Sequence, residues 1–214
     1  MHIRLYQPSD LSSVRAICCD TADRGNPIDS LFPDREVFAD LLMRYYTVYE
    51  PHALWVAQEE GGQVVGYLTG CLNNYRYGRL MMWSVIPRTV VKAIRHGALR
   101  SLLTWRWARA GWSTWLRQKH RAGISLSNYP AHLHVNLLPD FRGQHIGQAL
   151  VLRFLQQAHE VGVGGVHAAV RGDNLSSCRF FERLGFSEVG RTSTAFPNGT
   201  TYAWHDTIVY GTRL

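Results

Sequence analysis

The strand–helix–strand unit between residues 132 and 170 constrains the fold more than any other feature of the sequence. One apolar run, residues 132–138, ends at Pro139, and a second run occupies residues 166–170. The segment between them carries apolar side chains at the four-residue steps of a helix, namely Ile146, Leu150, Phe154 and Ala158. Two strands joined by a crossover of this length run parallel, with a right-handed connection. The sheet is therefore expected to contain at least one parallel pair.

The segments on either side of this unit predict further strands and helices. Before it we expect strands at 2–6, 53–58 and 64–72 and helices at 11–20 and 34–50, with a loop at 23–33. After it we expect a helix at 174–184 and an antiparallel pair, 186–193 and 202–209, around the turn Pro197-Asn198-Gly199. The length predicts one α/β domain, residues 1–214, with a mixed, mostly antiparallel sheet flanked by helices.

The composition excludes an intrinsically disordered chain, because 46% hydrophobic and 12% aromatic residues can build a packed core. The sequence has no run of about 18 uncharged apolar residues and no signal-peptide pattern at its start. We therefore expect a cytoplasmic protein without a transmembrane segment. The four cysteines lack a CxxC spacing, and the histidines lack a metal-ligand spacing. We expect reduced thiols and no metal.

Residues 73–128 interrupt the order of elements and are expected to form a basic, largely helical insert. Between Asn73 and Arg121 there are eleven Lys or Arg residues and no Asp or Glu. Five of the seven tryptophans lie here, namely Trp83, Trp105, Trp107, Trp112 and Trp115. This pattern permits a solvated face, a lid that steers an acidic acceptor, a homodimer surface, or a nucleic-acid or membrane-surface site. We expect no specific nucleic acid.

The junction between the strand and the helix of the unit is a candidate anion site. The first amides of a helix have no partner within the helix and lie at the positive end of its dipole. Glycines allow the backbone to approach a phosphate closely, and an arginine adds a charged contact. The candidate residues are Leu137, Leu138, Arg142, Gly143, Gln144, His145, Ile146 and Gly147.

Two motifs here resemble those of the Gcn5-related N-acetyltransferase (GNAT) family. The first, R/Q-x-x-G-x-G/A, is matched by Arg142 and Gly147, with His145 at the middle position that is usually Gly. The second, Asn-x-x-Ala-x-x-x-Tyr-x-x-x-Gly-Phe, is matched at its spacings by Asn174, Ser177, Phe181, Gly185 and Phe186. The resemblance is strong over residues 132–186 and extends back to Ile3. Within the family the chain is most similar to the acetyltransferase-like domain associated with O-GlcNAcase.

The resemblance implies a GNAT fold in which acetyl-coenzyme A (acetyl-CoA) enters a gap between the strands 132–138 and 166–170. It implies that the thioester meets a backbone amide near Leu137 or Leu138, and that Asn174 contacts the cofactor. Phe181 stands where the family often has a Tyr that protonates the leaving thiolate, so we expect it to pack against the pantetheine arm instead. Water, Tyr129, Tyr67 or another tyrosine could supply a proton in its place.

Direct attack by an acceptor amine requires a group that accepts a proton. Strand alternation places His132, His134 and Asn136 on one face, where a histidine with an ordinary pKa of about 6.5 can act as the base. The alternative is that the two histidines only bond to neighbouring groups in the sheet. Asn136 is expected to position the acceptor, and the candidate catalytic residues are His134, Asn136 and Leu138.

These features predict an N-acetyltransferase that transfers acetyl from acetyl-CoA to an unidentified amine on a small molecule or a protein. Two other functions remain open from the sequence. One is a non-catalytic acyl-CoA-binding module, and the other is a basic protein that binds nucleic acid or a membrane surface. Measured acetyl transfer separates the first of these from the enzyme.

Overall fold

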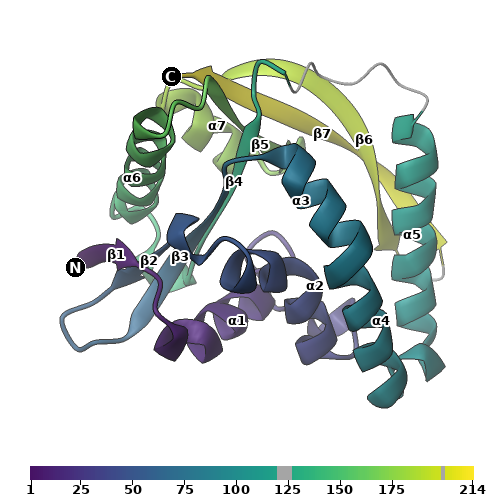
Figure 1. Ribbon diagram of the computed structural model, residues 1–214. Coiled ribbons are helices and arrows are strands. Elements are labelled where there is room, and N and C mark those ends of the chain that lie inside the picture. The colour runs from purple at the N-terminus through teal and green to yellow at the C-terminus, as the bar shows by residue number, and fades with distance from the viewer. Residues whose placement is uncertain (120–126, 199–200) are drawn as a thin grey trace.

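The computed structural model describes residues 1–119, 127–198 and 201–214, and it contains a seven-stranded sheet (Figure 1). The strand order is β1-β2-β3-β4-β5-β7-β6, and every neighbouring pair is antiparallel except β4 and β5. The strands are β1 (His2–Leu5), β2 (Leu54–Gln58), β3 (Val64–Cys71), β4 (Ala131–Leu137), β5 (Gly165–Arg171), β6 (Ser187–Asn198) and β7 (Thr201–Arg213). The expected mixed sheet with one parallel pair is confirmed.

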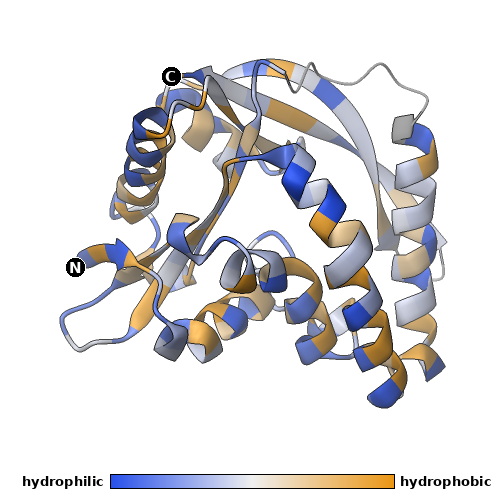
Figure 2. Ribbon diagram, in the orientation of Figure 1, coloured by the Kyte–Doolittle hydropathy of each residue, from blue (hydrophilic) through white to orange (hydrophobic). Residues whose placement is uncertain are grey.

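Helices cover both faces of the sheet, and each face has its own apolar core. One face packs against α6 (Ile146–Glu160) and α7 (Leu175–Arg183), and the other against α1 (Leu11–Asp20) and α2 (Arg35–Val48). Figure 2 shows that the central strands are largely hydrophobic, whereas the helices alternate hydrophobic and hydrophilic residues, as expected for elements buried on one side. None of the helices in the described ranges is long and apolar enough to cross a membrane.

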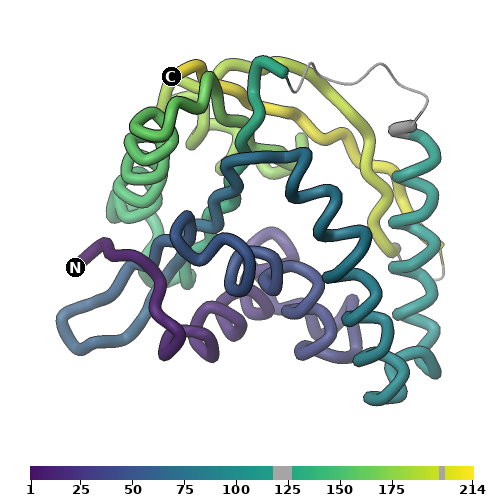
Figure 3. The backbone as a smooth tube through the Cα atoms, viewed as in Figure 1, coloured from purple at the N-terminus to yellow at the C-terminus, as the bar shows by residue number. Residues whose placement is uncertain are grey.

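The basic insert is helical, as predicted, in the part that the structure describes. It contains α3 (Asn74–Leu80), a π-helical turn (Met81–Val85), α4 (Ile86–Arg95) and α5 (Leu102–Lys119). Residues 120–126, which belong to the predicted insert, lie outside the described residues. In Figure 3 the continuous α3–α4 helix leads on to α5, and α5 lies beside the long β6–β7 hairpin.

Trp107 attaches α5 to the rest of the domain. Its ring makes edge contacts with Phe32 and Phe38, at centroid distances of 6.2 and 6.0 Å, and with Phe196 of β6 at 6.3 Å. Its indole N–H donates to the carbonyl of Leu31 at 2.9 Å. The insert is therefore packed against the α2 side and the hairpin at the same time.

The β6–β7 hairpin is longer than the sequence pattern predicted. The expected strands, 186–193 and 202–209, extend to Ser187–Asn198 and Thr201–Arg213, so Pro197 and Asn198 belong to β6 rather than to a turn. The added residues have a partner in α5, because the amide of Ala195 donates to the Thr114 hydroxyl at 2.9 Å. The remaining predicted turn residue, Gly199, lies outside the described residues. This extension depends on long-range packing, which a local pattern does not encode.

The parallel strands β4 and β5 separate soon after they meet. Only Ala131 pairs with Val166 and His132 with His167, although each strand contains seven residues. From Leu133 onward the edge of β4 that faces β5 has no strand partner. This splayed pair opens the gap that the family resemblance implies, and it positions the site described next.

Candidate active site

One cleft runs from the first turn of α6 into the gap between β4 and β5. It consists of two adjoining cavities of about 830 and 350 Å³, which share Val135, Leu137, Arg142, Ser176, Ser177 and Phe180 in their walls. The larger cavity lies at the start of α6, and the smaller one extends along β4 to the loop after α1. An extended ligand can therefore occupy both cavities at once.

The start of α6 presents a row of free backbone amides to the larger cavity. Within the described chain, none of the amides of residues 143–148 donates to a protein acceptor, and the first such bond into α6 runs from Ala149 to the carbonyl of His145. The positive end of the helix dipole lies at the same point. Unpaired amides at a helix start bind phosphate groups. The predicted anion site therefore has the geometry that it requires.

Arg142 supplies a positive charge beside these amides. Its guanidinium donates to the carbonyl of Leu137 at 3.1 and 3.2 Å and to the carbonyl of Gly25 at 3.3 Å. Gly25 has a φ of +92°, and a Cβ built there would lie 2.6 Å from an Arg142 nitrogen, so the loop approaches closely because this residue is glycine. Arg142 forms no ion pair with any described residue. Its charge remains available for an anionic ligand.

Two residues with positive φ bend the chain into this corner. Gly143 has φ +76° and His145 has φ +60°, and His145 immediately precedes the first residue of α6. Most side chains disfavour this left-handed conformation, which explains why the family motif usually has Gly at the position of His145. His145 adopts the glycine-like backbone all the same, and its exposed ring bonds to Gln148 at 3.1 Å. The His at this position therefore leaves the row of amides intact.

The structure distinguishes between the two amides predicted to meet a thioester. The amide of Leu138 donates to the carbonyl of Val65 on β3 at 3.0 Å, so it is not available to a ligand. Because N–H groups alternate between the two edges of a strand, the amides of Leu137 and Val135 point toward the gap. The prediction for the Leu138 amide is therefore wrong. The side chain of Leu138 packs in the core against α1 and α2.

His132 and His134 share a face of β4 but have different surroundings. His132 is buried, and its ring nitrogens bond to the Tyr46 hydroxyl at 2.8 Å and to the side-chain oxygen of Asn74. Both ring nitrogens of His132 are hydrogen-bonded. His132 therefore fits the structural role considered above, in which the histidine only bonds to its neighbours, rather than the role of a base.

His134 lies on the wall of the smaller cavity, and its ring nitrogens bond to no described residue. The ring is accessible to solvent, yet protein surrounds it on the walls of the cleft. This desolvation, together with repulsion from His167, lowers the pKa of His134 to about 4. The His134 ring is therefore neutral at pH 7 and able to accept a proton, and its lowered pKa makes it a weaker base than an ordinary histidine.

Asn136 links β4 to the end of α1. Its amide nitrogen donates to the Thr21 hydroxyl at 2.6 Å, and that hydroxyl donates to the carbonyl of Ile17 at 2.7 Å. The side-chain oxygen of Asn136 accepts no hydrogen bond from the described residues. Asn136 lines the smaller cavity. It is therefore held in one orientation with an acceptor atom free for a ligand.

The two predicted residues of α7 have structural roles in addition to their place in the cleft. Asn174 caps the helix, because its side-chain oxygen accepts from the amide of Ser177 at 3.2 Å. Phe181 is 5% exposed and packs against Phe186 and Tyr210, at centroid distances of 5.3 and 6.2 Å. Both residues also line the smaller cavity.

Sequence reasoning did not single out Phe180, although it lines both cavities. Its position beside the motif residue Phe181 is the signal that could have identified it. Neither Tyr67 nor Tyr129 lines the cleft: Tyr67 is buried on the α1 side of the sheet, and the ring of Tyr129 lies against Gly165 and Gly211.

Two arginines in the wall of the smaller cavity, Arg24 and Arg171, belong to a charged group around Asp173. Arg171 bonds to both carboxylate oxygens of Asp173, at 3.1 and 2.7 Å, and to the ring of His205 at 3.2 Å. Arg24, from the loop after α1, lies 3.7 Å from the same carboxylate. Among the described residues, no three His, Cys, Asp or Glu side chains form a group that could hold a metal ion.

The splayed strands, the glycine-bent corner and the free amides of α6 define an acyltransferase-like cleft. Residues 28–186 match the model of the acetyltransferase (GNAT) family. Because the match spans most of the chain, the protein belongs to the GNAT family of acetyltransferases. The predicted fold class is confirmed.

Three relatives illustrate the range of similarity. The crystal structure of SsHAT is 27% identical with a TM-score of 0.73, and the alignment covers 99% of this chain and 97% of that one. A phosphinothricin acetyltransferase from Sinorhizobium meliloti, solved in complex with acetyl-CoA, is 20% identical with a TM-score of 0.59 over 100% of this chain and 88% of that one. At this identity the second similarity shows the fold alone.

The third relative is the mycothiol acetyltransferase of Nocardiopsis dassonvillei, which is 38% identical over 53 residues. The matched segment spans 25% of this chain and 16% of that protein. None of the three relatives named here is described as associated with O-GlcNAcase, so that closer relationship stays a prediction from the sequence.

Proposed function

We propose that this protein transfers the acetyl group of acetyl-CoA to an acceptor amine by direct attack, with both substrates bound together. The observation that carries this proposal is the continuity of the cleft: the free amides of residues 143–148 and the His134 ring line two cavities that share Arg142 and Leu137. A long donor with phosphates at one end and a thioester at the other matches this arrangement. The acetyl-CoA complex of the Sinorhizobium meliloti relative supports the same donor.

The amides of α6 and the Arg142 guanidinium hold the phosphates of the donor. Phe180 and Phe181 offer apolar contact to its pantetheine arm. The amide of Leu137, which points into the gap, donates to the thioester oxygen as negative charge develops on it. One such donor contributes about 3 to 4 kcal/mol in well-studied acyl-transfer enzymes.

His134 removes the proton from the acceptor amine, and Asn136 orients that amine through its free side-chain oxygen. The new bond joins the amine nitrogen to the acetyl carbon, and the bond from that carbon to sulfur breaks. The coenzyme leaves as a thiolate, which is a tolerable leaving group because a thiol has an ordinary pKa of about 8.5. No acid from the position of Phe181 is required.

Calorimetry and thermal denaturation with acetyl-CoA test the donor site. A ligand at about 100 times its dissociation constant stabilises a protein by about 2.7 kcal/mol. We expect this stabilisation in the wild type, a weaker effect in Arg142→Ala, and none in Gly147→Glu, which places a negative charge at the anion site. Arg153→Ala is the matched control, because it removes a cation from α6 outside both cavities. No binding by the wild type would refute the proposal.

Thiol release with a panel of amines then tests catalysis. Release that depends on both the amine and acetyl-CoA supports transfer within a ternary complex. Tight acetyl-CoA binding without thiol release from any amine would favour the non-catalytic acyl-CoA-binding alternative.

A further inference from the structure

The α4 helix and the π-helical turn before it expose an apolar face to solvent. Met82, Ile86, Val90 and Ile94 follow one another at four-residue steps, and Trp83 and Val91 lie beside them. We call these six residues the α4 face; their exposed fractions range from 39% for Ile86 to 78% for Trp83. Contiguous apolar residues in contact with water mark an interaction site.

The side of α4 that faces the protein carries Thr89 and Ala93, which are buried, and Lys92, which is half-buried. The Lys92 ammonium contacts Glu36 and Asp40 of α2, at 3.2 and 3.0 Å. The Arg88 guanidinium bonds to the carbonyl of Ser84 within the insert at 3.3 Å. Because Thr89 and Ala93 take up the buried side of α4 and Lys92 binds α2, the larger apolar residues are left on the outside.

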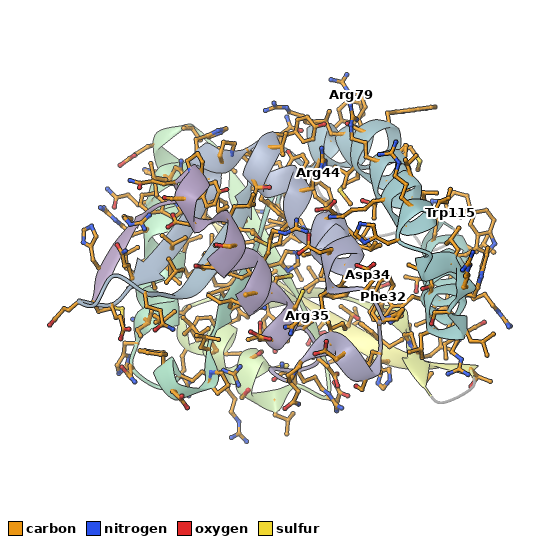
Figure 4. All side chains as sticks on the ribbon, turned by 90° about the horizontal axis from the view of Figure 1, so that it is seen from below. Phe32, Asp34, Arg35, Arg44, Arg79 and Trp115 are labelled. Atoms are coloured by element: carbon orange, nitrogen blue, oxygen red, sulfur yellow. The ribbon has the colours of Figure 1, made fainter. Side chains whose placement is uncertain are left out.

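Basic residues flank the α4 face in the sequence. Arg79, Arg95 and Arg100 are exposed and form no ion pair within the described part of the chain. Figure 4 shows Arg79 extending away from the protein at one edge of the molecule. No acidic residue occurs between Asn73 and Arg121 to neutralise this charge. A partner surface must therefore combine negative charge with an apolar interior.

We propose that the α4 face docks on the surface of an anionic lipid bilayer. A helix that inserts Trp and aliphatic side chains between lipid headgroups, with arginines at the level of the phosphates, is typical of interfacial binding. Each arginine near an anionic leaflet contributes about 1 kcal/mol. A bilayer offers both the negative charge and the apolar layer that this surface requires.

Two other occupants fit less well. A second copy of this chain in a two-fold dimer would place the face against itself, and the arginines of one copy would then oppose those of the other. Nucleic acid binds mainly through its phosphates and base edges, and it offers no apolar layer for Met82, Val90 and Ile94.

Cosedimentation with vesicles tests the proposal. We expect binding to vesicles of phosphatidylcholine mixed with phosphatidylserine, and much weaker binding to phosphatidylcholine alone. Trp83→Glu and Ile94→Glu should each lower the partition coefficient at least tenfold, and Arg79→Gln or Arg95→Gln about fivefold each. Val161→Glu is the matched control and should bind normally, because it changes an exposed apolar residue at the end of α6, outside the α4 face.

All variants should keep the melting temperature and the acetyl-CoA affinity of the wild type, because the changed side chains are exposed and lie outside the cleft. The proposal is wrong if the wild type does not bind anionic vesicles, or if Trp83→Glu binds them with the affinity of the wild type. It is also wrong if light scattering reveals a lipid-free dimer that Trp83→Glu dissociates. Duplex DNA binding that Trp83→Glu weakens, without vesicle binding, would assign the face to nucleic acid.

Discussion

His145 and Gly143 shape the corner before α6 through their backbone conformation rather than their side chains. Both have positive φ, and the residues that follow them line the larger cavity with amides that donate to no acceptor among the described residues. A Cβ at Gly143 would meet no atom within 4 Å, so the space there is open. A substitution at either residue should therefore act mainly through how readily the new residue adopts a positive φ.

His145→Gly should stabilise the ligand-free protein by up to about 1 kcal/mol, because glycine adopts a φ near +60° without the strain that a Cβ causes. The greater freedom of glycine in the unfolded chain reduces this gain. Gly143→Ala should cost about 1 kcal/mol for the opposite reason. Urea denaturation measures both variants. Equal stability of all three proteins would show that the corner relaxes when it is changed.

His134→Gln should lower the turnover number about 100-fold or more, within the range for loss of a general base. The dissociation constant for acetyl-CoA should not change, since His134 lies in the smaller cavity, away from the free amides of α6. Steady-state kinetics with an acceptor found in the amine panel, combined with calorimetry, separates the two effects. Full turnover by the variant would indicate that water or another group takes the proton.

At the scale of elements, α5 is a structural part of the domain as well as a carrier of basic charge. Its residues pack on β6, and Trp107 connects it to aromatic residues of the α2 side. Other tryptophans of α5 point outward, for example Trp112, which is 62% exposed. The insert therefore combines a packed side with a free side.

Trp107→Ala should destabilise the protein by about 2 to 3 kcal/mol, slightly below the cost of truncating a fully buried tryptophan, because Trp107 is partly exposed. It also removes the hydrogen bond to the carbonyl of Leu31. Trp112→Ala is the matched control and should change stability by less than about 0.5 kcal/mol. Chemical denaturation followed by circular dichroism measures both. Similar losses for the two variants would contradict the packed role of Trp107.

At the scale of the whole molecule, β4 and β5 bring three histidines together in the centre of the sheet. Ring centroids of His132 lie 5.6 Å from His134 and 5.7 Å from His167. Burial lowers the pKa of all three below the ordinary value, and repulsion from the neighbouring rings lowers the pKa of His132 and His134 further. The folded protein therefore keeps them neutral at a pH where the unfolded chain binds protons.

Stability should fall as the pH drops below about 6.5, because the unfolded state then takes up protons that the folded state excludes. Each histidine lowers the free energy of unfolding by up to about 1.4 kcal/mol per pH unit in this range. Solvent access reduces the contribution of His134. We therefore expect the free energy of unfolding to fall by a total of about 2 kcal/mol between pH 7.5 and 5.5. Urea denaturation at both pH values measures the loss. His132→Gln should be less stable at pH 7.5 yet show a shallower pH dependence, and a flat wild-type profile would contradict the argument.

The sequence by itself determined the features that depend on local chain chemistry. Helical spacing from Ile146 to Ala158 predicted α6, and the glycine-containing junction before it, which carries Arg142, indicated a candidate anion site. The spacing from Asn174 to Phe186 predicted α7 and its place beside the cleft. The predictions of α6 and α7 were confirmed because helix periodicity and helix starts are encoded within a few residues.

Only the tertiary structure decided which groups face the cleft. Strand alternation placed His132 and His134 on one face, but the neighbours Tyr46 and Asn74 come from distant segments and occupy only His132. The pairing of Leu138 with Val65 of β3 directs the Leu137 amide into the gap instead. The same holds for the α4 face, since its exposure follows from the ion pairs of Lys92 with α2. These outcomes depend on contacts between residues far apart in the chain, which no local pattern contains.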